Sequence, residues 1–379
     1  MGTQPDILRG ASRAQAAEDA ASELAEAIAQ PDATTFVFTS SRHDLSALSR
    51  ALTRRIPGPV VGCTTAGEIT PHGYARGSVV GFSIPRSVAE VKLFPIRNLD
   101  CISVMELSNV AGEVHDEVQR QRAQRPGVGA FGVLLVDGMS GAEEQVIGTI
   151  APALPGIPVV GGSAGDDLRH VQAHVLVNGE FCSDTAVLAL FTTERPFVPV
   201  RSQHFEPTET KLVITGARPE ARLVTRIDGR PAAEAYAALV GCGVDELDDE
   251  IFSTHPLMLR VGGGYYVRSI RKARKDGSLS FYCAIDEGLV LTIARALDMV
   301  STLDDCLSGA AEAVGVPELV IGFECIHRRL EAERRGRSED IGRLFARNKV
   351  IGFHSYGEQA DFIHINQTFT GVVLGEAPA

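Results

Sequence analysis

Three copies of one motif decide the fold expected for this chain: Val60-Val61-Gly62-Cys63-Thr64-Thr65-Ala66-Gly67-Glu68, Val159-Val160-Gly161-Gly162-Ser163-Ala164-Gly165-Asp166 and Val350-Ile351-Gly352-Phe353-His354-Ser355-Tyr356-Gly357-Glu358. Each copy starts with a β-branched pair and a glycine and ends with a glycine and a carboxylate, and the second copy is one residue shorter. Each copy lies roughly 25 to 35 residues after an apolar run and a helix-like segment. The sequence therefore predicts three repeated βαβ-like units.

These repeats predict an α/β fold with mixed sheets and two domains. At 379 residues the chain exceeds what one hydrophobic core usually serves. We expect an N-terminal amphipathic helix within residues 1–30, an N-terminal domain over 31–222 and a C-terminal domain over 223–379. The C-terminal domain would hold an inserted portion and the third unit, which should complete the sheet system begun by the first two.

Composition excludes several classes of protein. The net charge is −12 and most basic residues are scattered, which argues against a nucleic-acid partner and against binding to an anionic membrane. No apolar stretch reaches the roughly 18 residues needed to span a bilayer, and the charged N-terminus does not read as a signal peptide. Seven cysteines without a C-x-x-C pair fit neither a disulfide framework nor a zinc site. We therefore expect a cytoplasmic protein.

The three motifs also form the candidate site. Glycine at a strand end permits a positive φ and lets a ligand approach the backbone closely, so three equivalent strand ends are expected to converge on one cavity. The alternative is that these are turns whose glycines and acids only satisfy local backbone geometry. The candidate ligand-binding residues are Cys63, Thr64, Thr65, Glu68, Gly162, Ser163, Asp166, Arg328, Tyr356, Glu358 and Asn366.

Several separated motifs resemble the FIST family, with its N-terminal and C-terminal halves in order. They are the three copies above, Ile227-Asp228-Gly229-Arg230-Pro231-Ala232, Cys325-Ile326-His327-Arg328-Arg329 and Asn366-Gln367-Thr368, and the resemblance covers roughly residues 34 to 372. It implies a sensory module of microbial signal transduction that binds a small polar, amino-acid-like ligand, here between the two halves. It also implies a separate signalling partner such as a histidine kinase. His354 stands where the family more often has a small hydroxyl residue.

An amino-acid-like ligand would need charged partners. Glu68, Asp166 and Glu358 are candidates for its ammonium group, because carboxylates in a partly desolvated pocket form strong charge-assisted hydrogen bonds. Arg328 is the candidate for its carboxylate, which a guanidinium binds bidentately. The alternative is that the acids cap glycine turns and that Arg328 pairs with one of them.

Two other functions agree with parts of the sequence. Some stand-alone members of the family are haem-bearing nitric-oxide sensors, so haem is implied by the resemblance alone, with His354, His364 or Cys63 as candidate axial ligands; we predict no cofactor and no metal. The stretch from Gly161 to Gly165 also fits G-x-S-x-G of serine hydrolases. The elbow of those enzymes leads into a long helix, whereas here another strand pair is expected, so we predict that the protein is not an enzyme.

Overall fold

The computed structural model describes residues 7–360 and 362–377, which form two compact units. The first unit holds the described residues of Met1–Ser202, Asp304–His364 and Phe369–Ala379, and the second holds Gln203–Leu303 and Ile365–Thr368. The third repeat therefore belongs to the same compact unit as the first two, although it lies within residues 223–379 of the expected C-terminal domain. Among the described residues, no helix combines the length and the apolar character needed to cross a membrane.

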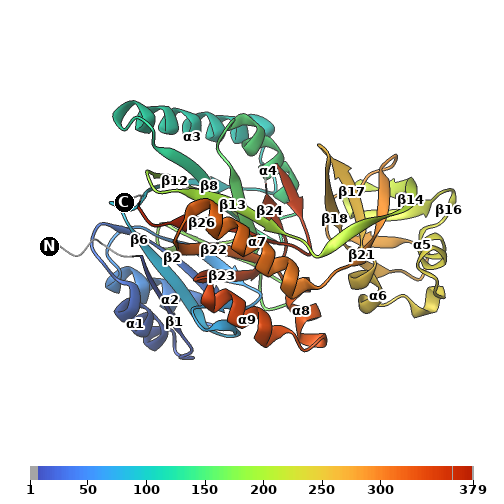
Figure 1. The fold of residues 1–379 in the computed structure, drawn as a ribbon, viewed down its shortest axis with the longest axis horizontal. Coiled ribbons are helices and arrows are strands. Elements are labelled where there is room, and N and C mark those ends of the chain that lie inside the picture. The colour runs from blue at the N-terminus through green and yellow to red at the C-terminus, as the bar shows by residue number, and fades with distance from the viewer. Residues whose placement is uncertain (1–6, 361, 378–379) are drawn as a thin grey trace. The chain divides into compact units, whose positions relative to one another are not determined.

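Each repeat builds the centre of one six-stranded sheet in the first unit (Figure 1). The first strand of the repeat and the motif strand run parallel, and a third strand pairs antiparallel with the first strand on its other side. The three sets are β2 (Ala33–Ser40), β3 (Val60–Thr65) and β6 (Val79–Pro85); β8 (Gly129–Asp137), β9 (Val159–Ala164) and β12 (Thr185–Thr193); and β22 (Pro317–Cys325), β23 (Val350–Ser355) and β26 (Phe369–Gly375). The α/β class with mixed sheets is thus confirmed.

The segment after each motif leaves its own repeat and pairs with the motif strand of another. β4 (Glu68–Thr70), which follows the first motif, pairs with β23 of the third repeat. β10 (Val175–Val177), which follows the second motif, pairs with β3 of the first repeat. β24 (Glu358–Ala360), which follows the third motif, pairs with β9 of the second repeat. The three repeats therefore exchange strands in a closed cycle.

The remaining strands of this unit extend the three sheets. One strand lies at the far edge beyond the third strand of each repeat, and the exchanged segments continue into a second short strand. They are β1 (Leu8–Ser12), β7 (Glu90–Arg97) and β13 (Phe197–Ser202) at the edges, and β5 (Gly73–Ala75), β11 (Glu180–Cys182) and β25 (Ile363–Ile365) after the exchanged strands. The strand β1, which precedes the first helix, is absent from the sequence-based expectation.

A single apolar core contains residues from all three repeats. The ring centroids of Phe38 and Phe353 lie 4.8 Å apart, and those of Phe36 and Phe191 lie 5.4 Å apart. Helices cover the other faces of the sheets, and their apolar sides form separate clusters against the first and second sheets. The helices of this unit are α1 (Ala17–Ile28), α2 (Leu45–Arg55), α3 (Val104–Gln124), α4 (Glu143–Ile150), α8 (Ile326–Arg334) and α9 (Ser338–Arg347), with the 3-10 turn Ala151–Ala153 after α4; α7 (Met299–Val314) begins in the second unit.

The second unit contains one sheet in the order β18-β17-β21-β14-β15-β20-β19, with β16 paired to β15. Its apolar core includes Tyr236, Phe252 and Phe281. Its elements are β14 (Phe205–Arg218), β15 (Leu223–Ile227), β16 (Arg230–Pro231), α5 (Ala232–Val240), α6 (Asp249–Thr254), β17 (Leu257–Val261), β18 (Gly264–Arg268), β19 (Ile270–Ala273), β20 (Leu279–Phe281) and β21 (Val290–Ala296), with 3-10 turns at Pro219–Ala221 and Val244–Glu246.

The first glycine of each motif is required by the close approach of two strands. A Cβ atom at Gly62 would lie 1.6 Å from the carbonyl oxygen of Val37, and the equivalent distances at Gly161 and Gly352 are 1.9 Å and 1.7 Å. We predict that Gly62→Ala lowers the free energy of unfolding by on the order of 3 kcal/mol or more, because backbone must move to admit the methyl group. Urea unfolding, monitored by circular dichroism, measures this change in the free energy of unfolding.

The matched control is Gly112→Ala on α3, where no heavy atom lies within 4 Å of the added Cβ. This change should leave stability unchanged or raise it by about 0.5–1 kcal/mol, since alanine favours helix. Equal stability of the Gly62→Ala and wild-type proteins would contradict the strand packing described here.

Candidate functional site

The three motifs bond to one another through their backbones within the first unit. We call residues 60–68, 159–166 and 350–358 the motif ring. The bonds that join it run from Ala66 N to His354 O (2.9 Å), His354 N to Gly67 O (2.8 Å), Ser163 N to Gly357 O (2.8 Å), Tyr356 N to Ser163 O (3.0 Å) and Gly165 N to Thr64 O (3.0 Å). The three strand ends therefore meet, whereas the cavity expected between them stays a prediction.

Two carboxylates of the ring are buried and held by donors close in sequence. Thr65 Oγ1 donates to Glu68 Oε1 at 2.5 Å, and Ser78 donates to Glu68 Oε2 from its backbone N at 3.1 Å and its Oγ at 2.6 Å. Ser355 likewise donates to the Glu358 carboxylate. Both acids are 0% exposed. These contacts are the ones that a structural role in the turn requires, and contact of either acid with a ligand stays a prediction.

Asp166 organises the loop that follows the second motif. Its carboxylate accepts hydrogen bonds from the backbone N of His170 (2.8 Å), Val171 (2.7 Å) and Gln172 (3.1 Å), and from the hydroxyl of Tyr356. Burial alone would raise the pKa of Asp166, but these hydrogen bonds outweigh burial and lower it. Asp166 is therefore a carboxylate at neutral pH that fixes the backbone of residues 170–172.

Arg328 lies in a buried ionic cluster beside the ring. It is 0% exposed, and its Nε lies 3.2 Å from Glu324 Oε1, while the Tyr74 hydroxyl donates to the other oxygen of Glu324. His354 Nδ1 lies 3.5 Å from the same carboxylate. Burial and the nearby guanidinium of Arg329 lower the pKa of His354 well below its usual value, so the imidazole is neutral at pH 7. Arg328 thus pairs with Glu324, an acid outside the three motifs.

The other predicted site residues are also enclosed. Cys63 lies in the apolar core, and Thr64 Oγ1 accepts from the backbone N of His174 at 2.9 Å. A Cβ at Gly162 would lie 2.9 Å from the ring of Phe353. Asn366 belongs to the second compact unit, and its contact with a ligand stays a prediction.

Tyr356 is the partly exposed member of the predicted set. Its ring stacks on that of His170 with centroids 4.9 Å apart, and its hydroxyl accepts a hydrogen bond from Leu168 N at 2.9 Å. Burial and the bond to Asp166 raise the pKa of its hydroxyl above the usual range. The accessible edge of the motif ring is therefore the loop 166–172 together with this tyrosine.

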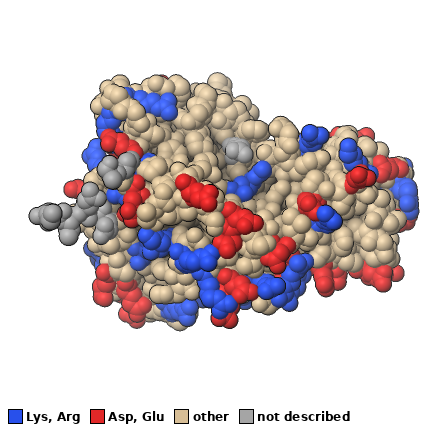
Figure 2. Space-filling model, viewed as in Figure 1, with Lys and Arg blue, Asp and Glu red and all other residues tan. Residues whose placement is uncertain are grey.

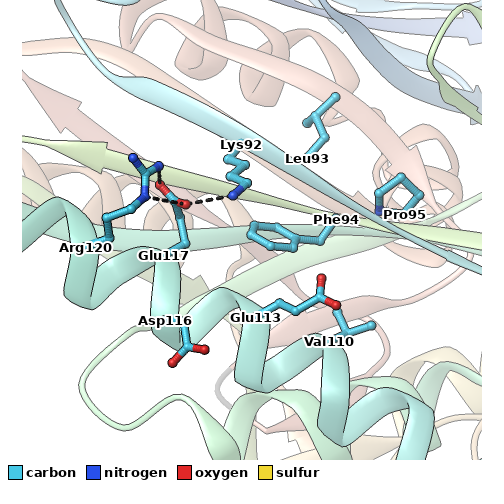
Figure 3. A pocket seen from close by; sticks show the side chains of 9 residues that line it. All are labelled: Lys92, Leu93, Phe94, Pro95, Val110, Glu113, Asp116, Glu117 and Arg120. Atoms are coloured by element: carbon cyan, nitrogen blue, oxygen red, sulfur yellow. Dashed lines mark hydrogen bonds and ion pairs between the residues drawn. The ribbon is translucent and has the colours of Figure 1, made fainter.

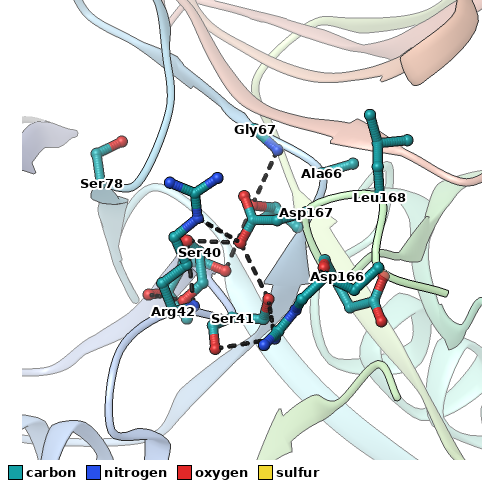
Figure 4. A network of polar contacts seen from close by, with 12 residues as sticks. Ser40, Ser41, Arg42, Ala66, Gly67, Ser78, Asp166, Asp167 and Leu168 are labelled. Carbon is teal, nitrogen blue, oxygen red and sulfur yellow. Dashed lines mark hydrogen bonds and ion pairs between the residues drawn. The ribbon is translucent and has the colours of Figure 1, made fainter. Parts of the chain in front are cut away.

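A second loop, which sequence reasoning missed, lies against this edge (Figure 4). Ser40 and Ser41, at the carboxyl end of β2, donate from their hydroxyls to Asp167 Oδ2 at 2.7 Å and 3.0 Å. Arg169 Nη2 donates to Ser41 Oγ at 2.7 Å. Arg42 Nε lies 4.0 Å from Asp167 Oδ2. The signal that would have found them is the run of polar residues directly after a parallel strand, where α/β proteins bind ligands.

A separate pocket of about 390 Å³ lies between β7 and α3 (Figure 3). No residue of the motif ring lines it. Its cations are already engaged, since Lys92 Nζ lies 2.7 Å and Arg120 Nε 3.1 Å from Glu117 Oε2. Burial alone would raise the pKa of Glu117, but its hydrogen bonds outweigh burial and lower it to about 2. We therefore place the candidate site at the edge of the motif ring.

The residues proposed for haem do not fit that group in this conformation. His354 and Cys63 are 0% exposed and His364 is 1% exposed. The ring of His354 lies edge-on to Tyr74 at 4.6 Å, and Cys63 is packed among core side chains. An axial ligand needs a flat apolar slot beside its donor atom, and these packed surroundings leave no such slot at His354 or Cys63.

Ser163 lacks the surroundings of a hydrolase nucleophile. It lies within β9, it is 0% exposed, and Gln359 Nε2 donates to its Oγ at 2.9 Å. An amide cannot accept the hydroxyl proton as a general base does. The chain after the motif continues to the strand β10 and not to the helix of a nucleophile elbow.

Glu68, the acid of the first motif, should make the stability of the protein depend on pH. Burial raises the pKa of Glu68 from 4.5 to about 7, against hydrogen bonds from Ser78 and Thr65 that lower it. The folded state then binds this proton more tightly than the unfolded state, so Glu68 makes the free energy of unfolding fall as pH rises between these values. The free energy of unfolding of the wild type should therefore decrease between pH 5 and pH 8, and we predict that Glu68→Gln makes this decrease smaller by on the order of 2–3 kcal/mol.

Urea unfolding at the two pH values measures this difference. Glu113→Gln, at an exposed position of α3, is the matched control and should keep the wild-type dependence on pH. An identical pH dependence in wild type and Glu68→Gln would show that folding does not raise the pKa of Glu68.

The space-filling view shows acidic and basic side chains intermixed on the face that it presents (Figure 2).

An uncharacterised protein of Methanocaldococcus jannaschii is 26% identical to the chain over 279 residues, which cover 64% of this chain and 54% of that protein. The chain thus spans about half the length of this relative. The FIST N domain matches residues 33–230, more than half of the chain, and the FIST C domain matches residues 232–361. The chain belongs to the FIST family.

Proposed function

We propose that the protein is a sensory ligand-binding protein of signal transduction, and that it binds a small polar ligand of the amino-acid type at the edge of the motif ring. The observation that carries this proposal is the meeting of the loop after β2 with the loop after β9, which sets cationic and anionic side chains side by side. FIST domains are proposed to sense small ligands, and membership of the family supports the sensory role.

The charges at this edge support a zwitterionic ligand. The side chain of Arg42 is 66% exposed, so its guanidinium group is accessible to a carboxylate. Arg169 is also exposed, and its guanidinium already donates to Ser41. The carboxylate of Asp167, 4.0 Å from Arg42 Nε and bonded by Ser41, is the anionic group at this edge. The aromatic ring of Tyr356, stacked on that of His170, adds an apolar surface to this edge. The hydroxyl groups of Ser40 and Ser41 add neutral hydrogen-bonding partners.

A sensor of this kind acts through another protein. We propose a separate signalling protein, such as a histidine kinase, as the partner. The odd set of seven cysteines without paired spacing supports a reducing compartment, and we propose the cytoplasm.

Calorimetry with a panel of the common amino acids tests the proposal. We predict that at least one of them binds, and that Arg42→Gln weakens that binding by about 1.5–3 kcal/mol, the usual contribution of a hydrogen bond to a charged group. The melting temperature should change little, because the Arg42 side chain is 66% exposed.

Arg86→Gln is the matched control. Its side chain is 72% exposed and pairs with Glu90, and neither residue belongs to the motif ring or to the loop after β2. This variant should bind as the wild type does. The proposal fails if no amino acid in the panel binds, or if Arg42→Gln binds with unchanged affinity.

A further inference from the structure

The carboxylate of Asp167 accepts hydrogen bonds from side chains in another part of the chain. Both hydroxyl groups that donate to it come from the loop after β2, 126 and 127 positions away in sequence. Ser40 Oγ is itself fixed by a bond from Arg42 N at 3.2 Å, and Ser41 Oγ by the bond from Arg169 Nη2 at 2.7 Å. These acceptor contacts leave each hydroxyl proton to point at Asp167. We call Ser40, Ser41 and Arg42 the carboxylate seat.

The loop that delivers Asp167 to the seat has an unfavourable backbone. Asp167, Leu168 and His170 have φ values of 57°, 64° and 53°, in the left-handed region. None of them is glycine, and left-handed φ is especially uncommon for a residue such as leucine. Three such residues within four positions persist only where surrounding contacts hold them, and here the bonds to Asp166 and Tyr356 do so.

The seat has the chemistry that a free carboxylate requires. Two hydroxyl donors converge on one oxygen, and a guanidinium stands close by with its remaining donors exposed. The fit to a carboxylate is demonstrated by the chain itself, since the side chain of aspartate ends in that group. The side chain of Asp167 is only 5% exposed, so it fills the seat almost completely.

We infer that Asp167 is an internal ligand that closes the seat, and that the carboxylate of a small-molecule ligand binds by displacing it. This inference rests on the proposed function and deepens it by assigning the ligand's carboxylate to Ser40, Ser41 and Arg42. Displacement releases the loop from its left-handed conformation, which offsets part of the cost of breaking the internal contacts. The freed Asp167 carboxylate then stands next to the ammonium group of an amino acid.

Displacement of Asp167 would also change the surface of the protein, and a signalling partner can detect such a change. Val171, in the same loop, is 77% exposed, and Leu168 is 37% exposed. Their backbone is tied to Asp166 and Tyr356, so a change at Asp167 moves apolar side chains that are already at the surface. The loop 166–172 is therefore the segment whose conformation differs between the closed and the ligand-bound protein.

The test uses acetate as the probe and empties the seat by mutation. In Asp167→Ala, sodium acetate should raise the melting temperature above that in sodium chloride of equal concentration, and acetate should bind about tenfold or more tightly than to the wild type. Adding Arg42→Gln to Asp167→Ala should cancel this gain. The matched control is Asp32→Ala, because Asp32 also has a left-handed φ, of 50°, and is exposed outside the seat.

A second variant allows the test if Asp167→Ala does not fold. Asp167→Asn keeps the size of the side chain and one acceptor oxygen but loses the charge, so acetate should compete with it more effectively than with the wild type. The inference is overturned if acetate and chloride act alike on every folded variant of Asp167. Binding of an amino acid by the wild type together with this result would refute the internal ligand alone. Specific acetate binding without any amino-acid binding would refute the proposed function alone.

Discussion

The backbone hydrogen bonds of the motif ring are the interaction on which the rest of the first unit depends. The bonds between Ala66 and His354, and between Ser163 and Gly357, cross from one repeat to another. Each motif also sends the strand that follows it into another repeat's sheet. No repeat completes its own sheet without a strand from another repeat. We therefore expect the three repeats to fold as one cooperative unit in spite of the long sequence separation between them.

This arrangement explains the burial of so many polar groups at one point. A strand crossing between sheets needs a turn in which backbone and side-chain groups bond to each other, because buried polar groups without partners are costly. Thr65 and Ser355, at equivalent positions, each donate to the acid three residues later. Asp166 achieves the same result with the backbone of its loop. The carboxylates that close the motifs are thus part of the structure that allows the exchange.

The same geometry brings a less stable element to the edge of a rigid ring. The loop 166–172 is held by Asp166, Tyr356 and the two serines, and its backbone contains three left-handed residues that are not glycine. Segments that respond to ligands are drawn from such regions, since small differences in contact energy change their conformation.

The sequence by itself determined the repeats, the positions of the parallel strands and the family. The β-branched pair and glycine of each motif are local signals, and the glycine is explained by a neighbouring strand only 1.6 Å from the missing Cβ at Gly62. The sequence also led to Tyr356 and Asp166, which lie at the accessible edge. It did not lead to Ser40, Ser41 and Arg42, because their meaning comes from contact with Asp167, 125 or more positions away. Nor did it show that Arg328 pairs with Glu324, an acid outside the motifs. Local patterns fix strands and turns, but the exchange between sheets is a long-range choice of partner, and only the tertiary structure decides which loops meet.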